Sequence, residues 1–139
     1  MSRTITVVGD VNTVDSRTLL TSQGSVTAPS LVVPAGMTKI KKIIAVAAAD
    51  GLADDGGATM FLRLGGSAIK NGEQVIVFAG QGNQTVQTGS DAAPNVGIPF
   101  VLEDADLDVS PSDTITIAAE MAGVDVGDTA VAVTLIYGK

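Results

Sequence analysis

Short segments in which apolar and polar residues alternate recur along the whole chain. Residues 3–8 read Arg-Thr-Ile-Thr-Val-Val, and residues 114–121 read Thr-Ile-Thr-Ile-Ala-Ala-Glu-Met. A period of two places the apolar side chains on one face of a β-strand. Sixteen glycines and five prolines separate these segments, as expected for an all-β sandwich or barrel. Strands are predicted at residues 3–8, 30–33, 38–48, 58–64, 73–79, 98–102, 107–109, 114–121 and 129–137.

Two parts of this pattern allow a second interpretation. In residues 38–48, Ile40, Ile43 and Ile44 also fit the spacing of a helix. We favour a strand because the first half of the segment is β-branched and a tight turn precedes it. Residues 80–96 are polar and are expected to form a long loop, which could include one strand at 84–88.

The 139 residues suffice for one domain with its own core. No composition break or linker divides them, so residues 1–139 are predicted to form a single jelly-roll-like antiparallel β-sandwich. Polar stretches at residues 10–16 and 21–30 precede the first proline-glycine turn. We therefore consider residues 1–16 a candidate N-terminal arm that orders on a neighbouring subunit, whose deletion would leave a folded sandwich.

Composition changes the picture of the surface. Charged residues make up 17% of the chain, against about 25% in ordinary globular domains. We expect other subunits to cover much of the surface, although a surface of Thr, Ser, Gln, Asn and Gly would also fit. The net charge of −7 argues against direct binding of nucleic acid. The longest apolar run, residues 43–49, falls short of the about 20 residues that a membrane helix needs, and no signal peptide is evident.

Catalytic chemistry finds little support in the chain. It contains neither cysteine nor histidine, which excludes disulfides, thiolate metal sites and Ser-His-Asp triads. The segment Gly80-Gln81-Gly82 begins like a dinucleotide-binding loop, but Thr85 stands where the third glycine belongs. We therefore expect no bound cofactor at this loop.

Carboxylate pairs for glycoside hydrolysis could be drawn from Glu73, Glu103 and Glu120, but no spacing fixes their separation. The chain has no tryptophan on which a sugar could stack. Its three phenylalanines are predicted to lie in the core: Phe61, Phe78 and Phe100. We therefore expect that the protein is not an enzyme.

An acidic segment carries the one candidate metal site. Asp104, Asp106 and Asp108 alternate, and clusters of oxygen ligands suit Ca²⁺. An EF-hand loop starting at Asp104 would need glycine and glutamate where Val109 and Ile115 stand. In a strand, the three aspartates would share one solvent-exposed edge and resist strand addition. They are weak calcium candidates, and no other cofactor is expected.

Lys39, Lys41 and Lys42 form a basic cluster. Its simplest interpretation is a solvated strand edge. In an assembly, the same lysines could pair with the acidic loops of a neighbouring subunit.

Two turns and the strands beside them carry a resemblance to a known group of proteins. Residues 31–43, Leu-Val-Val-Pro-Ala-Gly-Met-Thr-Lys-Ile-Lys-Lys-Ile, resemble a segment of viral single jelly-roll structural proteins. Residues 109–117 are similar to the late hairpin of the same folds, with Ser112 in place of the usual glycine. Residues 130–137 are similar to their final strand.

The resemblance implies a virion structural protein: a capsid, cement or decoration subunit located in the virion. Its partners would be further copies of itself, as a trimer or larger, and other virion proteins. One alternative is a carbohydrate- or receptor-binding module, in which residues 80–96 present hydrogen-bonding groups and acidic loops hold Ca²⁺. Another is a subunit of a cell-made filament or tube, which needs only self-complementary surfaces.

Overall fold

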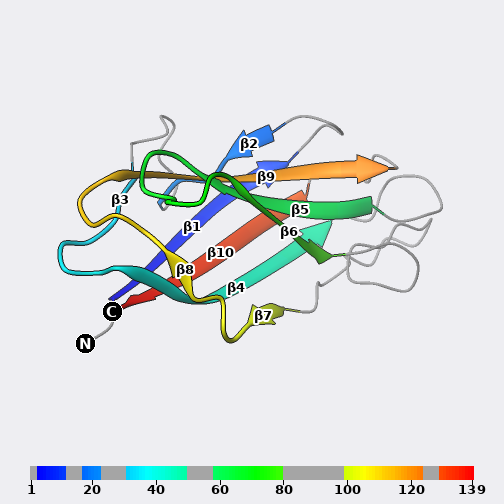
Figure 1. Cartoon of the computed structure of the whole chain (residues 1–139). Coiled ribbons are helices and arrows are strands. Elements are labelled where there is room, and N and C mark those ends of the chain that lie inside the picture. The colour runs from blue at the N-terminus through cyan, green and yellow to red at the C-terminus, as the bar shows by residue number, and fades with distance from the viewer. Residues whose placement is uncertain (1–2, 12–16, 23–30, 50–57, 80–98, 124–128) are drawn as a thin grey trace.

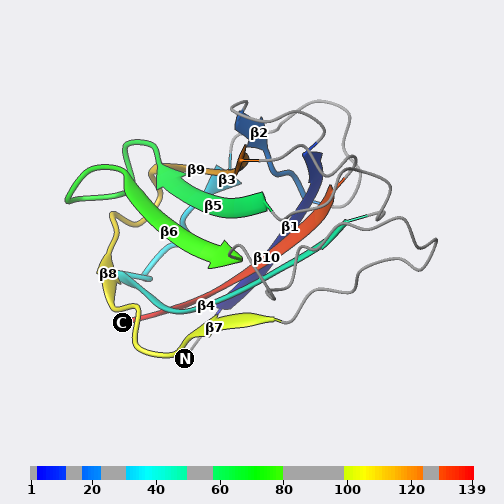
Figure 2. The same ribbon diagram turned by 90° about the vertical axis from the view of Figure 1, so that its right-hand side faces the viewer.

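The computed structural model describes residues 3–11, 17–22, 31–49, 58–79, 99–123 and 129–139. These residues form two antiparallel sheets that pack face to face (Figures 1 and 2). The described ranges contain strands, bridges and turns, and none of them holds a helix long and apolar enough to cross a membrane.

Each sheet has five strands. The first has the order β1-β10-β4-β7, with β8 also paired to β4: β1 (Arg3–Val11), β10 (Thr129–Gly138), β4 (Lys39–Ala49), β7 (Phe100–Leu102) and β8 (Leu107–Asp108). The second has the order β2-β9-β5-β6, with β3 also paired to β9: β2 (Arg17–Leu19), β9 (Thr114–Gly123), β5 (Ala58–Gly65), β6 (Gln74–Ala79) and β3 (Leu31–Val32).

The chain changes sheet repeatedly as it is followed from β1 to β10. Because β7 and β8 share one edge of β4, and β2 and β3 share one edge of β9, the ten strands occupy eight positions, four in each sheet. Among the described strands, only β5 and β6 are neighbours both in the chain and in a sheet. Two sheets of four positions joined by such crossings define a jelly-roll-like sandwich, which confirms the predicted fold.

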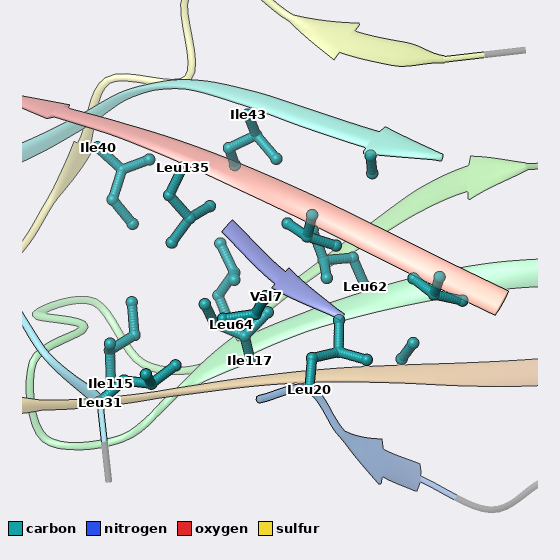
Figure 3. Packing of buried hydrophobic residues seen from close by; sticks show 14 of the residues in the cluster. Val7, Leu20, Leu31, Ile40, Ile43, Leu62, Leu64, Ile115, Ile117 and Leu135 are labelled. Atoms are coloured by element: carbon teal, nitrogen blue, oxygen red, sulfur yellow. The ribbon is translucent and has the colours of Figure 1, made fainter. Parts of the chain in front are cut away.

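The core lies between the inner faces of the two sheets. Figure 3 shows Val7, Ile43 and Leu135 of the first sheet directed toward Leu62 and Ile117 of the second. All five are buried. The strict alternation along β5, which faces Met60, Leu62 and Leu64 inward, was predicted correctly.

A β-bulge resolves the ambiguity of residues 38–48. Ile136 of β10 lies opposite Lys42, and Tyr137 lies opposite Ile40, so Lys41 has no partner in the β10 register. This extra residue shifts the alternation, and both Ile40 and Ile43 are buried although they are three residues apart. The helix-like spacing is therefore the signature of a bulged strand.

The turn before β9 also follows the predicted pattern. The backbone N–H of Asp113 donates to the Ser110 carbonyl at 3.3 Å. Ser112 has a φ of 68°, in the left-handed region that glycine adopts most easily. The position where the resemblance expects glycine is therefore a position where the backbone favours it.

Part of the candidate N-terminal arm, residues 1–16, lies in a strand. Residues 3–11 form β1, an edge strand of the first sheet whose Val7 and Val11 are completely buried in the core. This stretch belongs to the sandwich because its alternating valines complete the inner face of the sheet. Residues 12–16 lie outside the described residues, as do residues 80–98 with the predicted polar loop and its candidate strand.

The aromatic residues divide between the core and the surface. Phe78 is buried, as predicted, and Phe100 is partly buried against the core. The prediction for Phe61 was wrong, because the alternation that turns Met60 and Leu62 inward turns Phe61 outward.

Candidate interaction surfaces

The outer face of the first sheet is largely uncharged. Antiparallel register partners share a face of a sheet, so the pairing of β1, β10, β4 and β7 gives the outward-facing residues. We call this surface the β10 face, after its central strand. Its uncharged part consists of Thr4, Thr6, Val8, Ile44, Val46, Val101, Ala132, Thr134 and Ile136, and the same register places Lys42, Ala130 and Asp10 around it. All nine are at least partly exposed.

Two threonines at the centre of this face pair with each other. The hydroxyl oxygens of Thr6 on β1 and Thr134 on β10 lie 2.9 Å apart and share a hydrogen bond. Ile44 and then Val101 continue the same row across β4 and β7. The polar atoms of this row are therefore partnered within the sheet.

The outer face of the second sheet holds a four-charge network of Arg17, Arg63, Glu73 and Glu120. Arg63 donates from Nε to Glu120 at 2.8 Å and from Nη1 to Glu73 at 3.0 Å. Arg17 donates to Glu73 at 3.1 Å, and its Nε lies 3.7 Å from Glu120. These hydrogen bonds raise the pKa of Arg63, with Glu120 the larger cause. Two positive and two negative charges thus neutralise one another in the middle of this face.

The large exposed apolar side chains of the described residues all lie on edge strands. Leu19 and Val32 are each 52% exposed, Val75 and Val77 about half exposed, and Val101 42% exposed. They belong to β2, β3, β6 and β7, each of which has a sheet neighbour on one side among the described strands. Edge strands of monomers are usually protected by shortness, charged residues or proline. The strands β2, β3 and β7 are short, whereas β6 has six residues with no charge and no proline, so β6 is the least protected edge.

The basic cluster pairs with acidic residues of the same chain. Lys39 Nζ lies 2.9 Å from Asp108 and 3.4 Å from Asp106, and Lys41 lies 3.5 Å from Asp106. Lys42 lies 3.3 Å from Glu103. The hydrogen bond between Lys39 and Asp108 raises the lysine pKa and lowers the aspartate pKa. These lysines therefore form ion pairs that join β4 to the segment 103–108 of the same chain.

The three candidate calcium ligands are exposed, as predicted, but only Asp108 lies in a strand. Asp106 has a φ of 48°, and Ala105 beside it packs against the core. A surface hollow of about 360 Å³ is lined by Lys41, Glu103, Asp104 and Asp106. In the part of the chain that the structure describes, no three acidic side chains converge as metal ligands would. Calcium binding here stays a prediction.

Sequence reasoning missed the β10 face and the four-charge network. The face had a signal, because residues 129–137 read Thr-Ala-Val-Ala-Val-Thr-Leu-Ile-Tyr, which is apolar at both parities of the alternation. Such a strand has an apolar outer face as well as an apolar inner one. The network had no comparable signal, since its four residues come from separate segments of the chain.

No protein-family model matches this chain, and no curated protein matches it. Among solved structures, it is similar to a chain in the structure of infectious bursal disease virus Gx strain. The two are 13% identical in sequence, and their structures superpose with a TM-score of 0.42. The match covers 98% of this chain and 36% of that chain. This chain thus spans little more than a third of its longer counterpart, and a likeness of this degree does not bear on function.

Proposed function

We propose that this chain is a virion structural protein: a capsid, cement or decoration subunit that associates with copies of itself or with a capsid lattice. The observation that carries the proposal is the exposure of leucine and valine on four edge strands of a jelly-roll-like sandwich. In the proposed role the protein acts through its surfaces, without catalysis and without a cofactor, and is located in the virion.

The exposed edges support association because they combine unpaired backbone groups with exposed apolar side chains. An edge strand offers unpaired backbone N–H and C=O groups, and an apolar side chain beside them gains by leaving water. Val75 and Val77 lie on β6, a strand of six residues that contains no charge and no proline. A neighbouring subunit that covers β6 would bury both valines.

The fold is compatible with this role but does not select it. Double-sheet jelly rolls occur in viral capsid and lectin domains, and function is determined by sites on the fold. In the described residues, the two prominent charge clusters are internally paired. The exposed leucine and valine side chains of the edge strands are therefore the groups that would gain most from a contact, which suits a permanent protein contact better than a sugar.

The test is the size of the purified chain, measured by light scattering coupled to size exclusion over a range of concentrations. We expect trimers or larger assemblies, and negative-stain images that show shells, rings or extended lattices. Val75→Lys together with Val77→Lys should reduce the larger assemblies, because two charges on β6 oppose strand addition. A monodisperse monomer at every concentration, with no particles in the images, would contradict the proposed self-association and leave only binding to a preformed lattice.

A further inference from the structure

We infer that the β10 face packs against the β10 face of a second copy of this chain, related by a twofold axis. This inference rests on the proposed function and names the surface through which two subunits meet. It concerns a face of the sandwich, whereas the exposed edges described above would make separate, lateral contacts.

The charge distribution places apolar residues at the centre of the face and charges at its corners. Val8, Ala132 and Val46 form one cross-strand row with no polar side chain. Asp10 on β1 lies in the row after Val8, and Lys42 on β4 lies beside Ile136 in the row of Thr4, where it pairs with Glu103. Both lie outside the two central rows. Burying the centre of the face therefore requires no charge to leave water.

The central polar groups of the β10 face already have hydrogen-bond partners within the sheet, so they do not depend on water for them. Thr6 and Thr134 hydrogen-bond to each other at 2.9 Å. The strand β10 is paired along its length with β1 on one side and β4 on the other, so its backbone groups are satisfied. Burying a polar group that already has a hydrogen-bond partner costs little free energy. Water can therefore be excluded from the centre of this face when two copies meet.

Given the proposed self-association, the charge of the chain favours this face for the contact between two copies. Each molecule carries a net charge of −7, so two copies repel each other except where a contact avoids acidic groups. The two central rows of the β10 face are such a surface. The opposite outer face would have to desolvate Arg63 and Glu120, which is costly even for paired charges. Two pleated sheets also pack readily, about 10 Å apart.

The area of the face matches a modest dimer interface. Nine register pairs join β1 to β10, which at about 3.3 Å per residue gives a length of about 30 Å. Three full-length strands at about 4.8 Å spacing, with the short β7 beside them, give a width of about 17 Å with side chains, or about 500 Å² per copy. Two copies would bury about 1,000 Å², the size of a weak protein–protein interface.

The first experiment compares two alanine-to-glutamate variants by sedimentation velocity. Ala132 lies at the centre of the β10 face, and Ala122 is an equally partly exposed, outward-facing alanine on β9 of the other sheet. Ala132→Glu brings two like charges together in the dimer, and we expect it to weaken dimerisation about tenfold or more. Ala122→Glu should dimerise as the parent protein does. Circular dichroism and thermal unfolding verify that both variants fold.

The second experiment uses the absence of cysteine from the chain. Ala132→Cys should be cross-linked to a dimer by a short bismaleimide, and Ala122→Cys should not. Equal effects of the two glutamate variants, or cross-linking through Ala122→Cys alone, would overturn the inference while leaving self-assembly intact. Dimers that respond to Ala132→Glu but never enlarge would support the inference and contradict the proposed function. A parent protein that stays monomeric would overturn the inference and the proposed self-association on which it rests.

Discussion

Arg63 and Glu120 face each other diagonally across β5 and β9. Phe61 is the register partner of Glu120, and Ala118 is the register partner of Arg63, yet Arg63 Nε reaches the Glu120 carboxylate at 2.8 Å. Both side chains are partly buried, with 22% and 17% of their surface exposed. Through Arg17 and Glu73 the same pair connects β2, β9 and β5 with the residue before β6.

This geometry predicts which of the two glutamates of the network contributes more to the free energy of unfolding. Glu120→Gln should lower the free energy of unfolding more than Glu73→Gln, because Glu120 is less exposed and accepts the shorter hydrogen bond. Urea unfolding of the two variants in low salt measures the difference. The gap should widen in 1 M salt, because salt screens the more exposed Glu73 before it screens Glu120. A larger loss for Glu73→Gln would contradict the ranking.

Tyr137 predicts a specific alkaline sensitivity. Its hydroxyl is buried and finds no hydrogen-bond partner among the described residues, and burial raises its pKa from 10 to about 12. Above pH 10 the unfolded chain releases this proton while the folded chain keeps it. The contribution to stability is therefore complete below pH 10 and is lost up to pH 12, by about 1.4 kcal/mol per pH unit.

Tyr137→Phe tests both parts of this argument. At pH 7 the variant should be as stable as the parent or about 1 kcal/mol more stable, because no unsatisfied hydroxyl is buried. Between pH 10 and pH 11 it should lose less stability than the parent in denaturant titrations. Lysine deprotonation affects both proteins equally, so parallel pH profiles would refute the account.

Gly66 and Gly72 differ in what surrounds them, although both have a positive φ. A Cβ on Gly66 would lie 2.6 Å from the Thr114 carbonyl oxygen, whereas a Cβ on Gly72 meets nothing within 4 Å. Gly72→Ala should cost about 1–2 kcal/mol from backbone strain alone. Gly66→Ala should cost clearly more, because the β9 backbone must move. If Gly66→Ala and Gly72→Ala unfold at the same temperature, the contact between a Cβ at position 66 and the β9 backbone adds no cost, which would contradict this prediction.

The edge strand β1 should contribute to folding as well as to the β10 face. Val7 is completely buried, so Val7→Ala should cost about 2 kcal/mol, from two lost methyl groups and the cavity that they leave. Thr4→Ala, at an exposed position of the same strand, should change stability by less than about 0.5 kcal/mol. Equal stability of the two variants would return residues 3–11 to the role of a dispensable arm.

Salt should strengthen the contact between two β10 faces. Its centre contains no ion pair to screen, while each copy carries a net charge of −7 that repels the other. The dimer dissociation constant should therefore fall as sodium chloride rises from 50 to 500 mM. An increase would indicate that ion pairs hold the copies together, as would be expected if Lys39 and its neighbours contacted the acidic loops of another subunit.

Local patterning determined the strands and the class of fold. The alternation in β5 and β9 assigns the inner face, because a side chain in a strand must point to one face or the other. The turn with Pro34 and Gly36 and the turn at residues 110–113 were equally evident, since these residue types favour the required backbone angles. Asp104, Asp106 and Asp108 are exposed as predicted, but Asp104 and Asp106 lie outside the strands, so alternation within one strand does not explain their exposure.

Only the tertiary structure decided which residues share a surface. Strand order is set by pairing between segments that lie far apart in the chain, such as β1 with β10, and no local preference encodes that pairing. The bulge at Lys41, the network joining Arg17 to Glu73, and the β10 face all follow from this order. The sequence by itself therefore determined which way each strand faces, and long-range pairing determined what each face meets.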